Sequence, residues 1–255
     1  MPIDAITDVS ASIDAQWRLG TLVSVENLTI DISEAVVEVP SWPGHSAGQY
    51  ADVRLPGASR WERPHSYSIA NAPSRGPATY IRFAVPRVAL DDIPLQSTLY
   101  IDGPKGDRMA WRPGETDERP LLLIGGGTGI VPLLSVARAW AAQSHRGPLQ
   151  LIYSVRSLNR RLYEATLDAL AAEHDADVAT IVTGDGPWPM QRGRGGGRLS
   201  ALDLELFGLP PSAEPECFVC GPASFVESVT RMLVQTKHPA TRIRTEWEVS
   251  LEDVG

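Results

Sequence analysis

A run of glycines between two apolar stretches is the first place in this sequence where chemistry could occur. Residues 121–135 read LLLIGGGTGIVPLLS, which predicts a buried strand, a tight turn and a helix that opens near Ile130. The glycines let a ligand lie against bare main chain, and the amide groups that open the helix favour a phosphate. Because the spacing is not G-x-G-x-x-G, the turn indicates either a dinucleotide site or a purely structural turn.

Cys217 and Cys220 are the only two cysteines among the 255 residues. An iron–sulfur cluster of the plant type needs four thiolates, so this sequence does not supply one. The stretch CFVC is β-like, and residues three apart on a strand face opposite sides of a sheet. We therefore expect neither a redox disulfide nor a zinc site here. Reduced thiols suit a cytoplasmic protein.

The whole sequence has the composition of a globular protein. It is 43% hydrophobic and 21% charged, and its net charge of −8 argues against general nucleic-acid binding. The N-terminal residues lack the basic and apolar regions of a signal peptide. No apolar run approaches the ~20 residues that span a bilayer. These features predict a cytoplasmic location.

The first half of the sequence predicts an antiparallel β barrel of the Greek-key type. Short β-like runs alternate with turn signals such as Trp42-Pro43-Gly44, as in barrels and sandwiches. We expect a flexible N-terminus over residues 1–14 and a barrel domain over residues 15–113. The predicted strands are Trp17–Val25, Glu34–Val39, Gln49–Leu55, His65–Ala70, Tyr80–Val85 and Thr98–Ile101.

The second half predicts a doubly wound α/β domain with a parallel sheet, over residues 114–255. After a polar linker at residues 112–119, strand-like and helix-like segments alternate, which is typical of a parallel sheet. The predicted strands are Leu121–Ile124, Leu149–Ser154, Val178–Thr183, Cys217–Cys220 and Arg242–Trp247. The predicted helices are Val131–Ser144, Leu162–His174, Ala201–Leu206 and Pro222–Thr236.

Several motifs across both halves resemble those of one family. They are Gly48-Gln49-Tyr50, His65-Ser-Tyr-Ser-Ile-Ala-Asn71, Gly125–Pro132, Cys220-Gly221-Pro222 and Thr245-Glu246-Trp247. In their order and spacing they resemble the ferredoxin–NADP reductase superfamily, from about Trp17 to Trp247. The resemblance implies a flavin held by the barrel, NAD(P)H held by the α/β domain, and the two rings stacked where the domains meet.

The resemblance also implies roles for individual residues. The family's Arg-x-Tyr-Ser motif falls on His65–Ser68, so Tyr67 would pack on the flavin ring and Ser68 would bond near its N5; the alternative is two ordinary strand residues. Glu246 and Trp247 match the family's C-terminal motif, where Trp247 would either shield the ring or belong to the core. The implied catalytic residues are Ser68, Cys220 and Glu246. The implied cofactor-binding residues are Arg63, His65, Ser66, Tyr67, Ser68, Ile69, Ala70, Asn71, Val85, Gly103, Lys105, Gly126, Gly127, Thr128, Gly129, Arg156, Cys220, Gly221, Pro222 and Trp247.

The sequence departs from the family pattern where the flavin phosphate would bind. His65 replaces the family's arginine, and a histidine is only partly charged near neutral pH. Arg63 lies two residues earlier, on the same side of a strand, and could substitute. Residues 86–102 lack the family's Gly-x-x-Ser turn, so the helix terminus that would bind the pyrophosphate is missing. The cofactor is then FAD held unusually, by residues such as Arg87 and Lys105, or FMN, or a weakly bound flavin.

Arginines could decide between NADH and NADPH. Arg156, with Arg160 or Arg161, follows the second predicted strand of the α/β domain and could bind a 2′-phosphate. These side chains could equally cap or solvate the next helix. The basic loop RGRGGGR at residues 192–198 is either a solvated connection or a phosphate contact.

The sequence therefore predicts an NAD(P)H-dependent flavoprotein reductase, with FAD as the expected cofactor and FMN as the alternative. It would pass electrons to a separate ferredoxin or oxygenase. One alternative is an NAD(P)H-dependent reductase of free flavin. Another is a non-catalytic, reductase-like subunit with weakened flavin binding.

Overall fold

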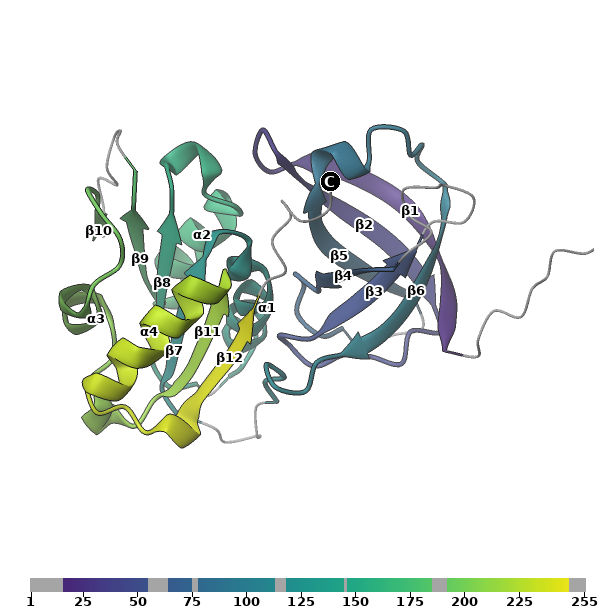
Figure 1. Ribbon diagram of the computed structural model, residues 1–255. Coiled ribbons are helices and arrows are strands. Elements are labelled where there is room, and N and C mark those ends of the chain that lie inside the picture. Colours follow the sequence, from purple (N-terminus) through teal and green to yellow (C-terminus); the bar gives the residue numbers. More distant parts are fainter. Residues whose placement is uncertain are drawn as a thin grey trace, which may run out of the picture.

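The computed structural model describes residues 16–54, 64–74, 78–112, 118–144, 146–184 and 192–247. Within these ranges the chain forms a β barrel followed by an α/β unit (Figure 1). The predicted N-terminal segment 1–14 and the predicted boundary between residues 113 and 114 fall outside the described ranges. The domain limits therefore stay predictions, whereas the fold class is confirmed.

Six antiparallel strands form the barrel, in the order β4-β3-β6-β1-β2-β5. An isolated bridge between Ile69 and Phe83 joins the two ends of this order. β6 lies between β3 and β1, so the chain crosses over as in a Greek key. The strands are β1 Trp17–Asn27, β2 Ile32–Pro40, β3 Tyr50–Arg54, β4 His65–Ser68, β5 Ala78–Pro86 and β6 Thr98–Lys105.

All six predicted barrel strands are present, but β4 is shorter than its apolar pattern indicates. The prediction extended it to Ala70, whereas the strand ends at Ser68. Ile69 and Ala70 are fully buried because they turn toward β5, where the Ala70 amide donates to the Arg82 carbonyl. Between β5 and β6 only a 3-10 turn, η2 Arg87–Ala89, is helical. The absence of a phosphate-binding α-helix in residues 87–97 agrees with the sequence.

The second unit is a parallel sheet with the strand order β10-β9-β8-β7-β11-β12. The chain moves outward from β7 to β10, then returns across β7 to build β11 and β12, which makes the sheet doubly wound. Its strands are β7 Leu121–Gly126, β8 Leu149–Val155, β9 Asp177–Val182, β10 Gly193–Arg194, β11 Glu216–Gly221 and β12 Ile243–Trp247. Its helices are α1 Ile130–Ala141, α2 Glu164–His174, α3 Ala201–Phe207 and α4 Ala223–Gln235.

Helices cover both faces of this sheet. Side chains of α1 and α2 share one core with alternate residues of the strands, and side chains of α3 and α4 share a second core on the other face. Cys220 belongs to the first core and Cys217 to the second, as the alternation of strand residues predicts. The sequence did not predict β10, because a two-residue strand in a glycine-rich loop has no apolar pattern.

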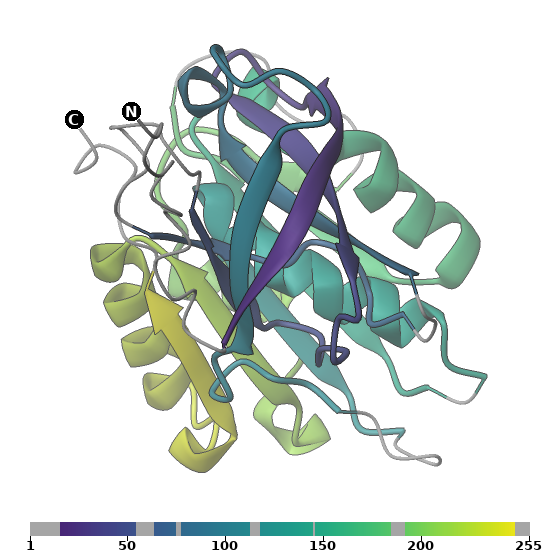
Figure 2. The same cartoon turned by 90° about the vertical axis from the view of Figure 1, so that its right-hand side faces the viewer.

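The barrel lies in front of the α/β unit in the view of Figure 2, and hydrogen bonds join the two units. The Ser135 hydroxyl and the Arg138 guanidinium, both on α1, donate to the carbonyls of Asn71 and Ala70 at 2.7 and 2.9 Å. At the edge of the sheet, Arg244 of β12 donates to the Ala110 carbonyl at 2.8 Å. These bonds hold the carboxyl ends of β7 and β11 next to the barrel, where ligands bind in open α/β sheets.

Candidate active site

A cavity of about 250 Å³ lies where the two units meet, and residues of all five sequence motifs line it. The barrel contributes residues of β3 and β4, and the α/β unit contributes the glycine turn, β11 and β12. Its lining includes Tyr50, Ser66, Tyr67, Ser68, Thr128, Gly129, Pro132, Cys220, Glu246 and Trp247. Residues that lie up to 197 positions apart in sequence thus share one small space, from Tyr50 to Trp247.

Glu246 is a carboxyl group of this cavity whose environment shifts its pKa strongly. It sits on β12 beside Cys220 of β11, in register with it. Burial raises the pKa of Glu246 to about 7, against the opposing charge of Arg108. Its Oε2 atom is buried and has no hydrogen-bond partner in the described part of the chain. Such a carboxyl group can hold or release a proton near neutral pH.

Tyr67 and Ser68 occupy the barrel side of the same cavity. The Tyr67 ring is 8% exposed, lies 6.3 Å from the Phe83 ring and joins the barrel core. Burial raises the pKa of Tyr67, so its phenol is neutral at physiological pH. His65 stacks beside Tyr67 with a ring separation of 6.4 Å and is not part of the cavity lining. Trp247 is 60% exposed, so it lines the cavity without belonging to the core.

Two positions of the glycine turn differ in why a glycine is found there. Gly127 has a φ of +57°, and a Cβ atom there would meet nothing within 4 Å, so its bare main chain faces open space. A Cβ atom at Gly129 would lie 2.4 Å from the Cys220 carbonyl oxygen, so this glycine allows the turn to pack against β11. The turn itself is a 3-10 segment, η3 Gly127–Gly129, that leads directly into α1.

A larger cavity of about 860 Å³ adjoins the first and shares Thr128 with it. The barrel supplies the turn after β1 and the η2 segment, including Ile30, Asp31, Arg87 and Val88. The α/β unit supplies Gly127, Arg156, Arg160, Leu162 and Pro222. Arginines therefore enter this cavity from both units, which suits an anionic ligand with an apolar part.

A third cavity of about 260 Å³ lies at the carboxyl ends of β7, β8 and β11. It shares Gly127, Arg156 and Pro222 with the large cavity, so the three cavities adjoin one another around the glycine turn. Its other lining residues include Ser154, Thr183, Arg198, Ser224 and Phe225.

Several predicted cofactor residues have other partners. Lys105 lies 2.6 Å from Asp52 and 2.5 Å from Asp102. Burial alone would lower the pKa of Lys105, but these two carboxylates raise it overall. Val85 is buried in the barrel core, and Gly103 packs against Ala51.

The remaining predicted residues are placed as follows. The Asn71 side chain accepts from the Arg82 amide of β5 at 2.9 Å. Ser66 donates to Asp52 at 2.5 Å while lining the small cavity. Arg160 pairs with Asp31 at 2.8 Å, and Arg161 pairs with Asp168 at 2.9 Å. Arg63 lies outside the described residues.

Sequence reasoning did not assign a site role to Tyr50, Ile30 or Val88, and it offered Arg198 only as part of a basic loop that is either a solvated connection or a phosphate contact. Tyr50 follows the Gly48-Gln49 signal, and Arg198 ends the basic loop, so both carried some indication. Ile30 and Val88 carried none, because an exposed aliphatic residue in a turn looks like any other surface residue.

Comparison with known proteins agrees with this arrangement. The family model described as "Oxidoreductase NAD-binding domain" matches residues 123–231. The reductase component of naphthalene 1,2-dioxygenase/salicylate 5-hydroxylase systems from a Ralstonia species is 30% identical over 223 residues, which is 85% of this chain and 64% of that protein. Ferredoxin–NADP reductase B from Sorangium cellulosum is 30% identical over 184 residues, 69% of this chain and 73% of that protein.

Among solved structures, the Amycolatopsis cytochrome P450 reductase GcoB has the same fold. Its TM-score is 0.77 at 23% identity, over 92% of this chain and 71% of that one. The chain thus spans only about two thirds of the length of the Ralstonia and Amycolatopsis proteins. Of the helices that the structure describes, none has the length and apolar character needed to cross a membrane.

Proposed function

The chain belongs to the ferredoxin–NADP reductase superfamily, and from this premise we propose that it is an NAD(P)H-dependent flavoprotein reductase. It would oxidise a reduced nicotinamide dinucleotide and pass the electrons, through a bound flavin, to an acceptor on a separate protein. The observation that carries the proposal is the small cavity, where Tyr67, Ser68, Cys220 and Glu246 come together from both units. Two flat rings brought to this point from opposite sides would meet in transfer distance.

The residues present fit a flavin on the barrel side. A flat ring with a polar edge needs an aromatic face and polar groups around it. The cavity offers the Tyr67 ring as the face. The polar groups are the hydroxyls of Ser66 and Ser68 and the Oε2 atom of Glu246, which has no hydrogen-bond partner among the described residues. Arg87 is the barrel residue whose charge can reach a phosphate in the large cavity. When bound, a flavin supplies an acceptor for two electrons that can be released one at a time. We propose FAD, because the large cavity can take its second nucleotide half.

The residues present also fit NAD(P)H on the α/β side. Gly127 presents open main chain ahead of α1, where amide groups favour a phosphate. Cys220 and Thr128 border the small cavity and would hold the nicotinamide end. Glu246 would hold a proton next to this point, because its pKa of about 7 lets it exchange one near neutral pH.

We propose that the electron acceptor is a ferredoxin or an oxygenase component. The Ralstonia relative is named as a ferredoxin–NAD(P)(+) reductase component of oxygenase systems, which supports this class of partner. The 255 residues contain two cysteines, fewer than a four-thiolate cluster needs. We also place the protein in the cytoplasm, because Cys217 and Cys220 form no disulfide and lie on opposite faces of the sheet.

Reconstitution with flavin tests the proposal. The purified chain is loaded with FAD, and its absorbance near 450 nm is followed after anaerobic mixing with NADPH or NADH. We expect rapid bleaching, followed by reoxidation with ferricyanide or a ferredoxin. No bleaching with either dinucleotide, by protein that has bound FAD, would overturn the reductase proposal and favour a non-catalytic subunit.

Two cysteine variants provide a matched pair for this assay. Cys220→Ala and Cys217→Ala each remove one buried sulfur from β11, but only Cys220 borders the cavity. We expect similar small losses of stability and a slowing of flavin reduction by about tenfold or more for Cys220→Ala alone, because misplacing the ring is costly. Equal rates of flavin reduction for the two variants would show that Cys220 is not part of the active site.

The second candidate function is the reduction of free, exchangeable flavin, and the ion pairs of Lys105 favour it. Lys105 is neutralised by Asp52 and Asp102, so the barrel has one cation fewer for a flavin phosphate. A reductase of free flavin needs such weak retention. Gel filtration of the loaded protein separates the two candidates, because a flavin that stays bound in one-to-one ratio supports the electron-transfer reductase and a flavin that is lost supports the second.

A further inference from the structure

Two segments from different units line the small cavity, and no stretch of chain fixes the distance between them. Tyr67 and Ser68 end β4 of the barrel, whereas the turn Gly127–Gly129 leads into α1 of the α/β unit. Because these segments lie far apart in sequence, noncovalent contacts between the units must set their spacing. α1 provides such contacts through buried polar side chains.

One side of α1 contacts both the cavity and the barrel. Val131, Ser135 and Arg138 follow one another at intervals of four and three residues, so they lie on the same side of the helix. Val131 lines the small cavity. The Ser135 hydroxyl donates to the Asn71 carbonyl at 2.7 Å. Arg138 donates to the neighbouring carbonyl of Ala70 at 2.9 Å. The helix thus borders the cavity at its first turn and bonds to the barrel at the next two turns.

The Asn71 carbonyl accepts from both units. His45 Nε2 lies 3.2 Å from this oxygen, and His45 Nδ1 lies 3.3 Å from the Trp42 indole nitrogen. An indole nitrogen only donates, so Nδ1 is the acceptor and Nε2 carries the proton that bonds Asn71. Burial lowers the pKa of His45, against the effect of the bond to Asn71, and so favours this neutral ring. With Ser135 as the second donor, both lone pairs of the carbonyl are used.

The segment that joins Ser68 to Asn71 is itself held at each residue. The Ile69 amide donates to the Gln49 carbonyl at 2.9 Å, and the Ala70 amide donates to a carbonyl of β5 at 2.8 Å. Both Ile69 and Ala70 are fully buried. Close-packed interiors transmit displacements, so a shift of the Asn71 main chain reaches Ser68.

We propose that Ser135 is a positioning residue for flavin reduction, which sets the place of Tyr67 and Ser68 relative to the glycine turn by holding the Asn71 carbonyl. This rests on the proposed function, because the spacing matters only if two rings meet in the small cavity. Ser135 is fully buried, lies about 8 Å along the helix axis from the first residue of α1, and is not among the lining residues of the three cavities. It therefore acts through Asn71.

Amide hydrogen exchange of the chain without cofactor, followed by NMR, tests the contact. We expect Ser135→Ala to speed exchange of the Ile69 and Ala70 amides by about 5- to 10-fold, because the loss of one hydrogen bond makes local opening easier. Unchanged exchange at these two amides would overturn the proposal, whatever the activity. If Ser135→Ala does not fold, Ser135→Cys replaces it, since a thiol is only a weak donor.

Anaerobic mixing of the FAD-loaded chain with NADPH or NADH tests the consequence. We expect Ser135→Ala to lower the limiting rate of flavin reduction by about 10- to 100-fold, because misplaced rings react slowly. The dissociation constant of the dinucleotide should stay unchanged, since the glycine turn and Cys220 keep their places. kcat and kcat/KM then fall together. An unchanged rate, or a rise in KM alone, would overturn the proposal.

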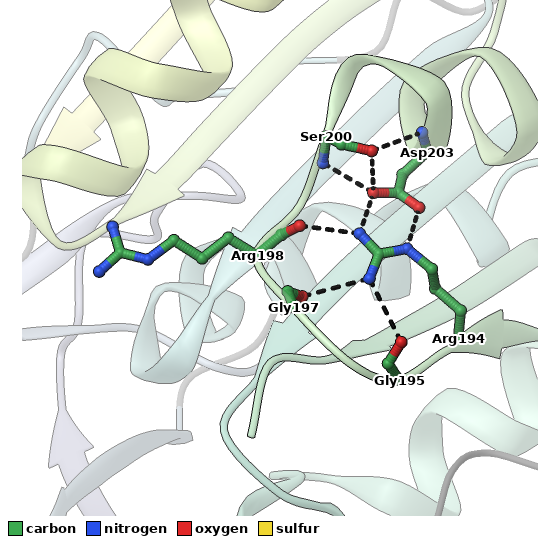
Figure 3. Close-up of polar contacts among 6 residues, drawn as sticks. All are labelled: Arg194, Gly195, Gly197, Arg198, Ser200 and Asp203. Carbon is green, nitrogen blue, oxygen red and sulfur yellow. Dashed lines mark hydrogen bonds and ion pairs between the residues drawn. The ribbon is translucent and has the colours of Figure 1, made fainter. Parts of the chain in front are cut away.

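Ser200→Ala is the matched control. The Ser200 hydroxyl donates to Asp203 at 2.7 Å, the same length as the Ser135 bond, and caps α3. Figure 3 shows this pair together with Arg194, which also bonds Asp203, so all these contacts lie within the α/β unit. The variant removes a bonded serine hydroxyl without touching the barrel, and we expect exchange at Ile69 and flavin reduction to match the unmodified chain. Equal effects of the two serine variants would overturn the positioning role.

The unmodified chain separates this inference from the function on which it rests. If it binds FAD but reduces it with neither dinucleotide, the reductase proposal is overturned, and the role of Ser135 in that reaction with it. If it is active and Ser135→Ala is equally active, only the role of Ser135 is overturned.

Discussion

Glu246 carries its carboxyl group into a mostly buried position on β12, beside Cys220 and Trp247. Burial raises its pKa to about 7, far above the 4.5 of an ordinary glutamate. A group whose pKa is raised on folding stabilises the protein below its unfolded pKa, and that contribution is lost as the pH rises through the folded pKa. The window for this residue therefore runs from about pH 4.5 to above pH 7.

We expect Glu246→Gln to abolish this pH dependence. Between pH 5 and 8, the original chain should lose unfolding free energy relative to the variant, by at most about 3 kcal/mol, because only the glutamate must ionise in a buried place. Thermal unfolding at several pH values measures the difference. Glu173→Gln, on an exposed position of α2, is the control and should follow the original chain. Parallel curves for the original chain and Glu246→Gln would contradict the raised pKa.

At the scale of elements, the connection from β7 to α1 depends on two glycines for different reasons. Gly129 is needed because η3 packs against the main chain of Cys220 and Gly221 in β11. Gly127 is needed because its φ is +57°, although a side chain there would have space. The same turn therefore packs against β11 through Gly129 and exposes the main chain of Gly127 to the cavities.

Alanine substitutions should separate these two requirements. We expect Gly129→Ala to destabilise the chain by about 1–3 kcal/mol, because the new Cβ atom displaces the β11 main chain. Gly127→Ala should cost about 1 kcal/mol, from the left-handed backbone alone. Urea unfolding measures both, with the slope of the transition as the check that the unfolded state is unchanged. A larger loss for Gly127→Ala than for Gly129→Ala would contradict the assignment.

At the scale of the whole molecule, α1 is the element that joins the two units. Arg138 donates to the Ala70 carbonyl of the barrel and to Thr166 of α2, and it stacks on the Tyr163 ring at 5.4 Å. Burial lowers the pKa of Arg138, which shows how far it lies from solvent. The cavities of the site lie between the units, so their shape depends on this interface.

We expect Arg138→Met to weaken the coupling between the units. The loss of a charged hydrogen bond should cost about 1.5–3 kcal/mol, and the calorimetric unfolding transition should broaden or split. Arg146→Met is the matched control, because Arg146 stacks on Trp140 and bonds the carbonyls of Gln143 and His174 within the α/β unit. A single sharp transition in both variants would show that Arg138 does not couple the units.

The amino-acid sequence by itself determined the elements and their order. Apolar alternation, glycine turns and helix periodicity are local properties, so the six barrel strands and the four helices followed from them to within a few residues. β10 did not, since only its pairing with Thr180 and Ile181 of β9 makes it a strand. The motifs around Tyr67, Gly127 and Cys220 could likewise be recognised in the sequence as candidate site residues. The family resemblance implied that these motifs meet between the two domains, where residues of all three line one cavity.

Only the tertiary structure decided which of the candidate cations are paired within the protein. Sequence position alone does not distinguish four cations that lie near glycines or strand ends, namely Lys105, Arg156, Arg160 and Arg198. In the fold, Lys105 is neutralised by Asp52, which lies 53 residues away, and Arg160 by Asp31 of the other unit. Arg156 and Arg198 line the third cavity. The reason is physical: an ion pair depends on distance in space, which sequence separation does not specify.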